Sequence, residues 1–364
     1  MASLARAGTG FSLQDFADSL PLLPQATLYT ARKVISMDAA SPVADAVAVV
    51  GDRVLFVGPR AEVAARLGDQ PFTQDDRFEG KVILAGMIDQ HVHPVLAALT
   101  MTLEIIAIED WVLPTGTAKA ALNAEDYMAR LTAAEAALQD PAEPLITWGY
   151  HHYFHGLVRR AQLEAISAAR PIVVWHRSAH EVILNSAALT LLGITADLVA
   201  ALPAAALAQT SFEDGYFYET GFFAIMPKLA PLLATPERLT AGLELTRDYL
   251  HRSGVTVACE PGGVLSRPLQ EVQNKILGGS DVPFRMHYIP DGKSLAALYA
   301  GPEMIAQTEA LMSWGARAGV VPADAGQAVR RWRDLQPADA DARRLHRRAQ
   351  GRMDHGTGGV RPGV

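Results

Sequence analysis

Short apolar runs alternate with longer amphipathic segments along most of the chain. The runs at residues 82–93, 146–150 and 172–175 are short and apolar, and the last two follow prolines. Such runs are typical of parallel strands that are covered on both faces. Residues 123–138 and 236–253 instead show helical periodicity, with Ala and Leu on one face of the first. This alternation predicts an α/β fold of the kind that a β/α barrel requires.

Further signals support the same reading toward the end of this region. Thr235 is a suitable N-cap for the helix predicted at residues 236–253. Residues 254–260 and 283–289 read as two more strands. Together these strands account for about half of an eight-stranded barrel.

Two histidines, one residue apart, end the first of these runs. In a strand, alternate side chains share a face, so His91 and His93 would point the same way, about 7 Å apart along the backbone. Imidazole nitrogens suit zinc and its neighbours in the divalent series. A bare His-x-His pair more often caps a surface strand. The Gly-x-Ile-Asp lead-in and the following Pro94 favour a metal site instead.

The same segment resembles the first barrel strand of the amidohydrolase superfamily, whose usual form is P-G-x-I-D-x-H-x-H. Only Ala85 departs from this pattern, since proline is usual there. Residues 26–58 are similar to the small β-sandwich that precedes the barrel in these enzymes. Residues 146–150 and 171–180, with Asn-Ser-x-Ala-Leu at 185–189, resemble the amidohydrolase 3 or YtcJ-like branch, which includes N-substituted formamide deformylases. The resemblance covers roughly the first 315 residues.

The resemblance implies an α/β fold made of a partial, TIM-like (β/α) metal-dependent hydrolase barrel and a small N-terminal β-sandwich. We expect an N-terminal tail at residues 1–22 and the sandwich at residues 23–84. The first part of the barrel would occupy residues 85–316. A C-terminal tail would follow at residues 317–364.

This C-terminal tail is dominated by Arg, Ala, Asp and Gly and lacks Ile, Phe, Tyr, Lys and Glu, a composition that predicts disorder. Its arginines could form a nucleic-acid-binding arm, but the interspersed aspartates and the acidic whole chain argue against this. Codons allowed for residues 326–359, read one base forward, can encode a string that resembles the next family segment, including its V-K-x-F-x-D-G strand. We therefore expect a frame change near residues 316–321 and a truncated amidohydrolase.

By the same resemblance, the protein would be a metal-dependent hydrolase of carbon–nitrogen bonds in non-peptide amides, acting through metal-activated water. His91 and His93 would be two ligands of a divalent metal, which we expect to be zinc. The family's later Lys, His and Asp ligands have no counterpart here, so the site would be incomplete and the chain inactive. The sequence assigns no catalytic acid or base. The alternative is a non-catalytic, small-molecule-binding remnant.

Three residues are candidates for the substrate pocket. His180 matches the histidine of the branch motif, and with Asn185 it would line the pocket, although a histidine satisfied by a helix cap is an equal alternative. Glu219 lies in a G-x-x-x-E element of the branch and completes this set.

Six other polar residues carry weaker signals. The cluster of His151, His152 and His155 follows a strand into a loop, and we expect pocket or surface positions for it rather than metal ligation. Cys259 and Glu260 end a predicted strand, where catalytic groups gather in barrels. Packing is nevertheless the commoner role for a lone cysteine, and we expect His287 to lie in the core.

Composition narrows the class of protein. The 364 residues are 49% hydrophobic with a net charge of −7, which gives no reason to expect nucleic acid. A single cysteine excludes an internal disulfide. The N-terminus lacks signal-peptide features, and no apolar run reaches the roughly 18 residues needed to span a bilayer. We expect a cytoplasmic protein with a small amide-type substrate and no membrane partner, and its oligomeric state stays open.

Overall fold

The computed structural model describes residues 25–263 and 266–315. Both predicted tails, residues 1–22 and 317–364, lie outside the described residues, as does the predicted frame change. The chain divides into two compact units, residues 1–86 and 87–364. In the described ranges, no helix is long and apolar enough to cross a membrane.

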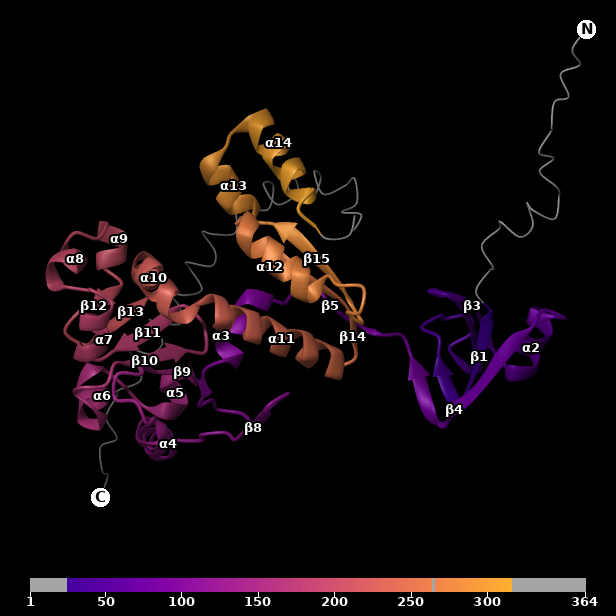
Figure 1. Cartoon of the computed structure of the whole chain (residues 1–364), viewed down its shortest axis with the longest axis horizontal. Helices are drawn as coiled ribbons and strands as arrows, with labels where there is room; N and C mark the ends of the chain where they lie inside the picture. Colours follow the sequence, from indigo (N-terminus) through magenta and orange to yellow (C-terminus); the bar gives the residue numbers. More distant parts are fainter. Residues whose placement is uncertain (1–24, 264–265, 316–364) are drawn as a thin grey trace, which may run out of the picture. The chain divides into compact units, whose positions relative to one another are not determined.

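The first unit is one four-stranded sheet in the order β3-β2-β1-β4, with a helix against it (Figure 1). Its elements are β1 (Ala26–Ile35), β2 (Val43–Val50), β3 (Arg53–Gly58), α2 (Arg60–Leu67) and β4 (Phe72–Leu84). Strands β1, β2 and β3 pair antiparallel, whereas β4 runs parallel to β1. Val63 and Leu67 of α2 pack on Leu28 and Ala46. The sequence predicted a β-sandwich here, and residues 25–86 show one sheet covered by a helix.

The second unit contains a small parallel sheet in the order β15-β14-β5. Its strands and flanking helices are β5 (Met87–Asp89), α3 (Pro94–Met101), α11 (Pro236–Arg252), β14 (Val255–Gly263), α12 (Arg267–Leu277) and β15 (Arg285–Pro290). Thr235 caps α11 as predicted, because its hydroxyl accepts the amide proton of Arg238 at 3.2 Å. A Cβ on Gly242 would lie 2.1 Å from the Ala98 carbonyl oxygen, so only glycine allows α11 to approach α3 this closely.

A larger mixed sheet, in the order β12-β13-β11-β10-β9-β6, forms the rest of this unit. Its strands are β6 (Glu104–Ile105), β9 (Leu145–Tyr150), β10 (Ile172–His176), β11 (Glu181–Leu184), β12 (Thr210–Ser211) and β13 (Tyr216–Tyr218). Strands β6, β9 and β10 are parallel, and the other three pair antiparallel. The remaining elements are α4 (Ala124–Ala137), α5 (His152–His155), α6 (Arg160–Ile166), α7 (Ser186–Leu191), α8 (Ala196–Ala200), α9 (Ala204–Leu207), α10 (Thr220–Leu233), α13 (Gly292–Leu298), α14 (Gly301–Met312) and the hairpin of β7 (Trp111–Leu113) and β8 (Gly116–Ala118).

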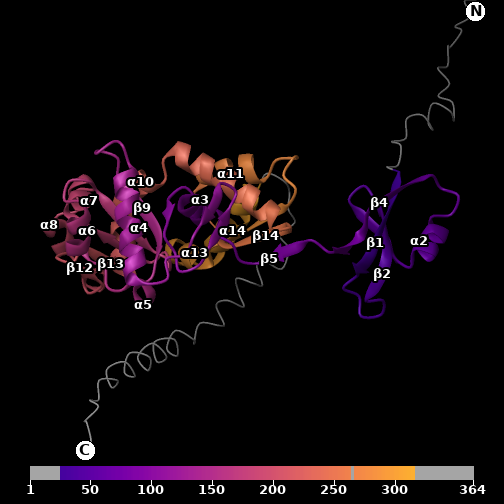
Figure 2. The same cartoon turned by 90° about the horizontal axis from the view of Figure 1, so that it is seen from below.

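Helices cover both faces of the mixed sheet. Helix α4 lies on one face (Figure 2). Its Tyr127 and Leu131 pack against Ile172 and other buried residues of β9 and β10. On the other, Phe222 and Ile225 of α10 pack against alternate residues of the same strands. This double coverage explains why β9 and β10 are buried along their whole length and are mostly apolar.

The predicted strands at residues 146–150 and 172–175 are confirmed as strands, but not as members of the sheet that contains β5. The prediction that these strands belong to one barrel with β5 is therefore wrong for the described residues. There, only β14 and β15 share a sheet with β5. The chain turns back after β10, where Ala179 adopts a φ of 62°, and pairs antiparallel as β11. Apolar periodicity predicts a strand but does not specify its neighbour, and a closed barrel is not seen within residues 25–263 and 266–315.

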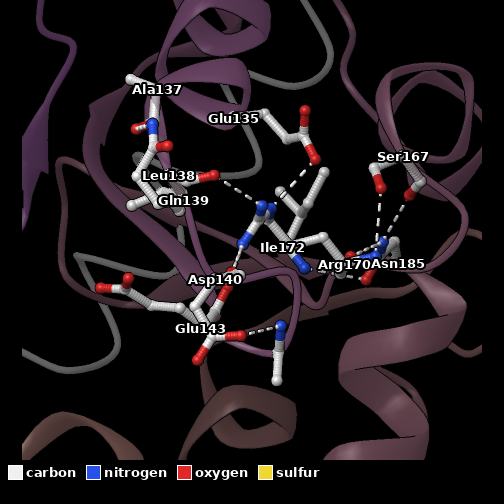
Figure 3. A network of polar contacts seen from close by, with 11 residues as sticks. Glu135, Ala137, Leu138, Gln139, Asp140, Glu143, Ser167, Arg170, Ile172 and Asn185 are labelled. Atoms are coloured by element: carbon white, nitrogen blue, oxygen red, sulfur yellow. Dashed lines mark hydrogen bonds and ion pairs between the residues drawn. The ribbon is translucent and has the colours of Figure 1, made fainter.

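A buried polar network fixes the points where β9 and β10 begin (Figure 3). The Arg170 guanidinium donates to the Glu135 carboxylate at 2.9 Å and to the carbonyls of Leu138, Asp140 and Glu143 at 3.1, 2.5 and 2.7 Å. Only 7% of the Arg170 side chain is exposed. Four acceptor groups between residues 135 and 143 are thus bonded to a single cation.

Asn185 completes this network and caps α7. Its amide oxygen accepts from the backbone N–H groups of Ile172 and Ala188, both at 2.9 Å. Its amide nitrogen donates to the carbonyls of Ser167 at 2.9 Å and Arg170 at 2.8 Å. Since all four hydrogen-bonding positions of this amide are used and the side chain is fully buried, no atom of it is left to contact a ligand.

Candidate functional site

His91 and His93 lie in the loop between β5 and α3, immediately after the strand. The prediction extended the strand through His93, whereas β5 ends at Asp89 and His93 is the N-cap residue of α3. The Asp89 carboxylate accepts the amide proton of His91 at 3.1 Å, and Val92 donates its amide proton to the Cys259 carbonyl at 2.9 Å. The first bond fixes the start of the loop, and the second attaches the loop to β14.

The two imidazole rings converge. The Nε2 atoms of His91 and His93 are 3.2 Å apart, and the rings are nearly perpendicular. Two nitrogens bound to one tetrahedral zinc ion at 2.0–2.1 Å would be separated by about 3.3 Å. Burial, and then the neighbouring His91, lower the pKa of His93, which favours the neutral form that binds metals. The pair therefore fits two positions of a zinc site.

Glu260 lies in β14, three residues before the strand ends at Gly263, and is next to this pair. Its carboxylate oxygen lies 3.8 Å from Nδ1 of His93, and the residue is only 3% exposed. Burial raises the pKa of Glu260 to about 7. The other carboxylate oxygen is buried without a hydrogen-bond partner. The group can therefore hold or release a proton near neutral pH, directly behind the His93 imidazole.

The neighbours of Glu260 on β14 and β15 contribute no ligand nitrogen or thiolate to this pair. Burial, followed by the charge of Asp89, raises the pKa of Cys259, so its thiol stays protonated. His287 lies opposite Cys259 in the strand register and is half-buried, less enclosed than a core position.

His180 and Glu219, two of the predicted pocket residues, are brought together. Nδ1 of His180 lies 3.2 Å from the Glu219 carboxylate, and both side chains are about half exposed. The backbone N–H of Glu219 also donates to the His180 carbonyl at 2.8 Å. Glu219 has a φ of 44°, a conformation that costs of order 1–3 kcal/mol for a residue other than glycine and often marks functional positions. Asn185, the third predicted pocket residue, is the buried cap described above.

A second group of histidines forms where β9 and β10 end. The ring nitrogens that His151, His152 and His176 can offer to a metal all lie within 4.8 Å of one another. Of these three residues, His151 and His152 were predicted from the sequence, together with His155, as pocket or surface residues, and His176 was not predicted. The parallel alignment that places Tyr150 opposite His176 was the missing signal.

His155 does not join this group. It is buried, where its Nδ1 accepts the amide proton of His151 at 3.0 Å and its Nε2 lies 2.8 Å from the Ala121 carbonyl oxygen. These bonds hold the loop after β9 in place, so His155 has a structural role.

Comparison with solved structures gives distant similarities. An uncharacterized metal-dependent hydrolase from Pyrococcus horikoshii OT3 aligns with a TM-score of 0.49 at 13% identity, over 75% of this chain and 50% of that chain. A second uncharacterized metal-dependent hydrolase, from Pyrococcus furiosus, aligns with a TM-score of 0.48 at 13% identity, over 76% and 54%.

Sequence comparison identifies the family. The protein LONG AFTER FAR-RED 3 of Arabidopsis thaliana is 25% identical over 171 residues, which are 46% of this chain but only 26% of that relative. The match thus spans about a quarter of the length of the curated relative. The sequence model of the amidohydrolase family matches residues 78–337, well over half of the chain. That range includes His91, His93 and Glu260, and the chain belongs to the amidohydrolase family.

Proposed function

We propose that this chain contributes to a metal-dependent hydrolase that cleaves carbon–nitrogen bonds of non-peptide amides. One observation carries the proposal: the Nε2 atoms of His91 and His93 are 3.2 Å apart, with the buried Glu260 carboxyl behind His93. Membership of the amidohydrolase family supports the reaction class. The YtcJ-like branch and formamide-type substrates follow from the sequence motifs alone. A cytoplasmic location and the absence of nucleic-acid and membrane partners likewise remain proposals.

The residues divide the work as follows. His91 and His93 would hold a zinc ion, which when bound supplies a Lewis acid for the carbonyl and lowers the pKa of water. Glu260 would orient His93 through Nδ1, and its pKa of about 7 lets it take up or release a proton at working pH. The exposed pair of His180 and Glu219 would contact the polar part of the substrate.

A specific observation favours a second candidate function, that of a non-catalytic small-molecule-binding remnant. Two imidazoles fill only half of a tetrahedral shell, and in the described residues the one group of three clustered ligand side chains lies elsewhere, at His151, His152 and His176. A weakly held metal would leave the pair of His180 and Glu219 as a binding surface without chemistry.

Metal content and turnover separate the two functions. The full chain would be freed of metal with a chelator, reloaded with zinc, and assayed on a panel of N-substituted formamides and simple aryl amides. The hydrolase hypothesis expects turnover by the wild type. His91→Ala/His93→Ala should lose this turnover and should bind one zinc ion per chain fewer than the wild type. His251→Ala, an exposed histidine at the end of α11, is the matched control and should behave as wild type. Zinc content unchanged in the double variant would show that the site is wrong, and amide binding without turnover would support the remnant.

A further inference from the structure

Topology brings a second set of metal-ligating side chains to one edge of the mixed sheet. Strands β9 and β10 are neighbours in the sheet (Figure 1) and run parallel, so both end on the same side. In this pairing Tyr150 lies opposite His176. His151 follows β9 directly, and His152 is the first residue of α5. As a result, three imidazoles from two strand ends present ring nitrogens within 4.8 Å of one another.

A shift in the pairing of β9 and β10 orients the three histidines. The pairing of β9 and β10 shifts between the Trp148–Trp175 and Tyr150–His176 pairs, and Gly149 at the shift has a φ of 110°. A Cβ at this glycine would lie 2.8 Å from the Ala107 side chain and 2.9 Å from the Ile106 carbonyl oxygen. Bulges of this kind are common beside functional sites, where they redirect a side chain.

One ring nitrogen of His176 is available to bind a cation. The residue is 4% exposed, and its Nε2 is buried without a hydrogen-bond partner. Leaving a buried polar group unsatisfied costs about 1–3 kcal/mol. Burial lowers the pKa of His176 to about 4, so the ring is neutral and able to bind a cation at neutral pH.

Stacking between the rings is the competing explanation for the cluster. The ring centroids are 5.1 to 5.7 Å apart, and His152 is roughly parallel to both His151 and His176. Stacking accounts for the proximity of the rings, but it leaves Nε2 of His176 unsatisfied. A cation shared by the three rings accounts for both observations.

The geometry requires a small movement and a proton shift. Tetrahedral zinc holds its nitrogen ligands about 3.3 Å apart, so the ring atoms must approach by at most about 1.5 Å. His152 is exposed and free to make this adjustment. For ligation through Nε2, Nδ1 of His176 and of His151 must carry the proton. The backbone N–H groups of Ser178 and Tyr153 donate to these atoms at 3.0 and 3.3 Å. After the proton shift they would donate to water instead, and both residues are exposed.

Acceptors for the relocated proton on His176 are already in place. Nδ1 of His176 lies 2.8 Å from the Ser178 hydroxyl and 3.7 Å from the Glu181 carboxylate. The Tyr216 hydroxyl donates to the other oxygen of Glu181 at 2.5 Å. A carboxylate behind a ligating histidine fixes its tautomer and strengthens the metal bond in known zinc sites.

We propose that His151, His152 and His176 bind a divalent cation of the zinc class, leaving its fourth position open to water or a substrate atom. Three protein ligands and one open position are the arrangement of catalytic rather than structural zinc sites. The proposal does not depend on metal binding by His91 and His93.

The test uses the full chain carrying His91→Ala/His93→Ala, so that only the second site remains. Cobalt(II) replaces zinc as a visible probe, and zinc stoichiometry is measured in parallel. We expect one ion per chain. Replacing His152 with Ala should weaken binding at least about 100-fold, because loss of a direct ligand exceeds the 10–100-fold cost of losing a group behind one. Since His152 is exposed, this change spares the core. His180→Ala and His287→Ala are the controls and should bind as the background does.

A ligand swap identifies the site directly. In His152→Cys, cobalt binding should produce a thiolate-to-cobalt charge-transfer band, which the background containing only Cys259 should lack. The absence of stoichiometric metal in the background would overturn the proposal. Cobalt bound by His152→Cys without this band would also overturn it, because the metal would then lie elsewhere.

Discussion

Removal of the Arg170 side chain is the most direct test of how the strand ends are held. In Arg170→Ala, the carbonyls of Leu138, Asp140 and Glu143 and the carboxylate of Glu135 all lose their donor. Each unsatisfied buried group costs about 1–3 kcal/mol, although water entering the space left by the guanidinium recovers part of this. Breaking a buried ion pair by removing one partner typically costs about 3–5 kcal/mol, and we expect a loss of that size.

Urea denaturation followed by tryptophan fluorescence measures this loss, since Trp148 and Trp175 are buried in the same sheet. Arg267→Ala is the matched control, because Arg267 pairs with Glu271 at 3.0 Å with both side chains about two-thirds exposed. Such a pair contributes about 0–1 kcal/mol. Arg170→Lys should recover only part of the loss, because one ammonium cannot reproduce the forked geometry. If Arg170→Ala costs no more than Arg267→Ala, the network does not hold the sheet and the reasoning fails.

Three other substitutions test separate parts of the structure. Because the folded-state pKa of Glu260 is raised from 4.5 to about 7, its protonated form stabilises the fold at low pH, and this contribution is lost as pH rises from about 4.5 through 7. In metal-free protein the loss should be about 3 kcal/mol, and Glu260→Gln should remove it; equal pH slopes for both proteins in urea titrations would contradict the assignment. Asn185→Ala should lower the free energy of unfolding by about 2–4 kcal/mol, because a helix cap and three further hydrogen bonds are lost. A melting temperature within a degree of wild type would argue against a structural role for Asn185. Gly242→Ala should destabilise the contact of α11 with α3 by about 1–3 kcal/mol. The control Ala241→Gly, at the neighbouring exposed position, should lower stability by only about 1 kcal/mol through helix propensity. Equal losses in the two variants would show that the close approach of the helices does not require glycine.

Local signals in the sequence were sufficient for several features. Thr235 before Pro236 predicted the start of α11. Helical periodicity at residues 123–138 predicted α4, which Asn123 caps in the structure by accepting the amide proton of Asp126 at 2.9 Å. These features depend on residues within one turn of each other, so the sequence carries them directly. The spacing of His91 and His93 likewise limited the distance between their rings before any fold was known.

Tertiary structure decided what depends on residues far apart in the chain. Apolar runs predicted β9 and β10, but the pattern of side chains in a strand does not specify which strand pairs with it. In the structure, β9 and β10 pack between α4 and α10, in a sheet separate from that of β5. The sequence predicted a strand ending at Glu260, whereas β14 continues to Gly263. The pKa of Glu260 is set by burial next to His93, 167 positions earlier in the sequence. His176 meets His151 and His152 because two parallel strands end together at an alignment that side-chain periodicity cannot specify. In each case the deciding quantity is a distance fixed by packing, and this is the information that the sequence does not state locally.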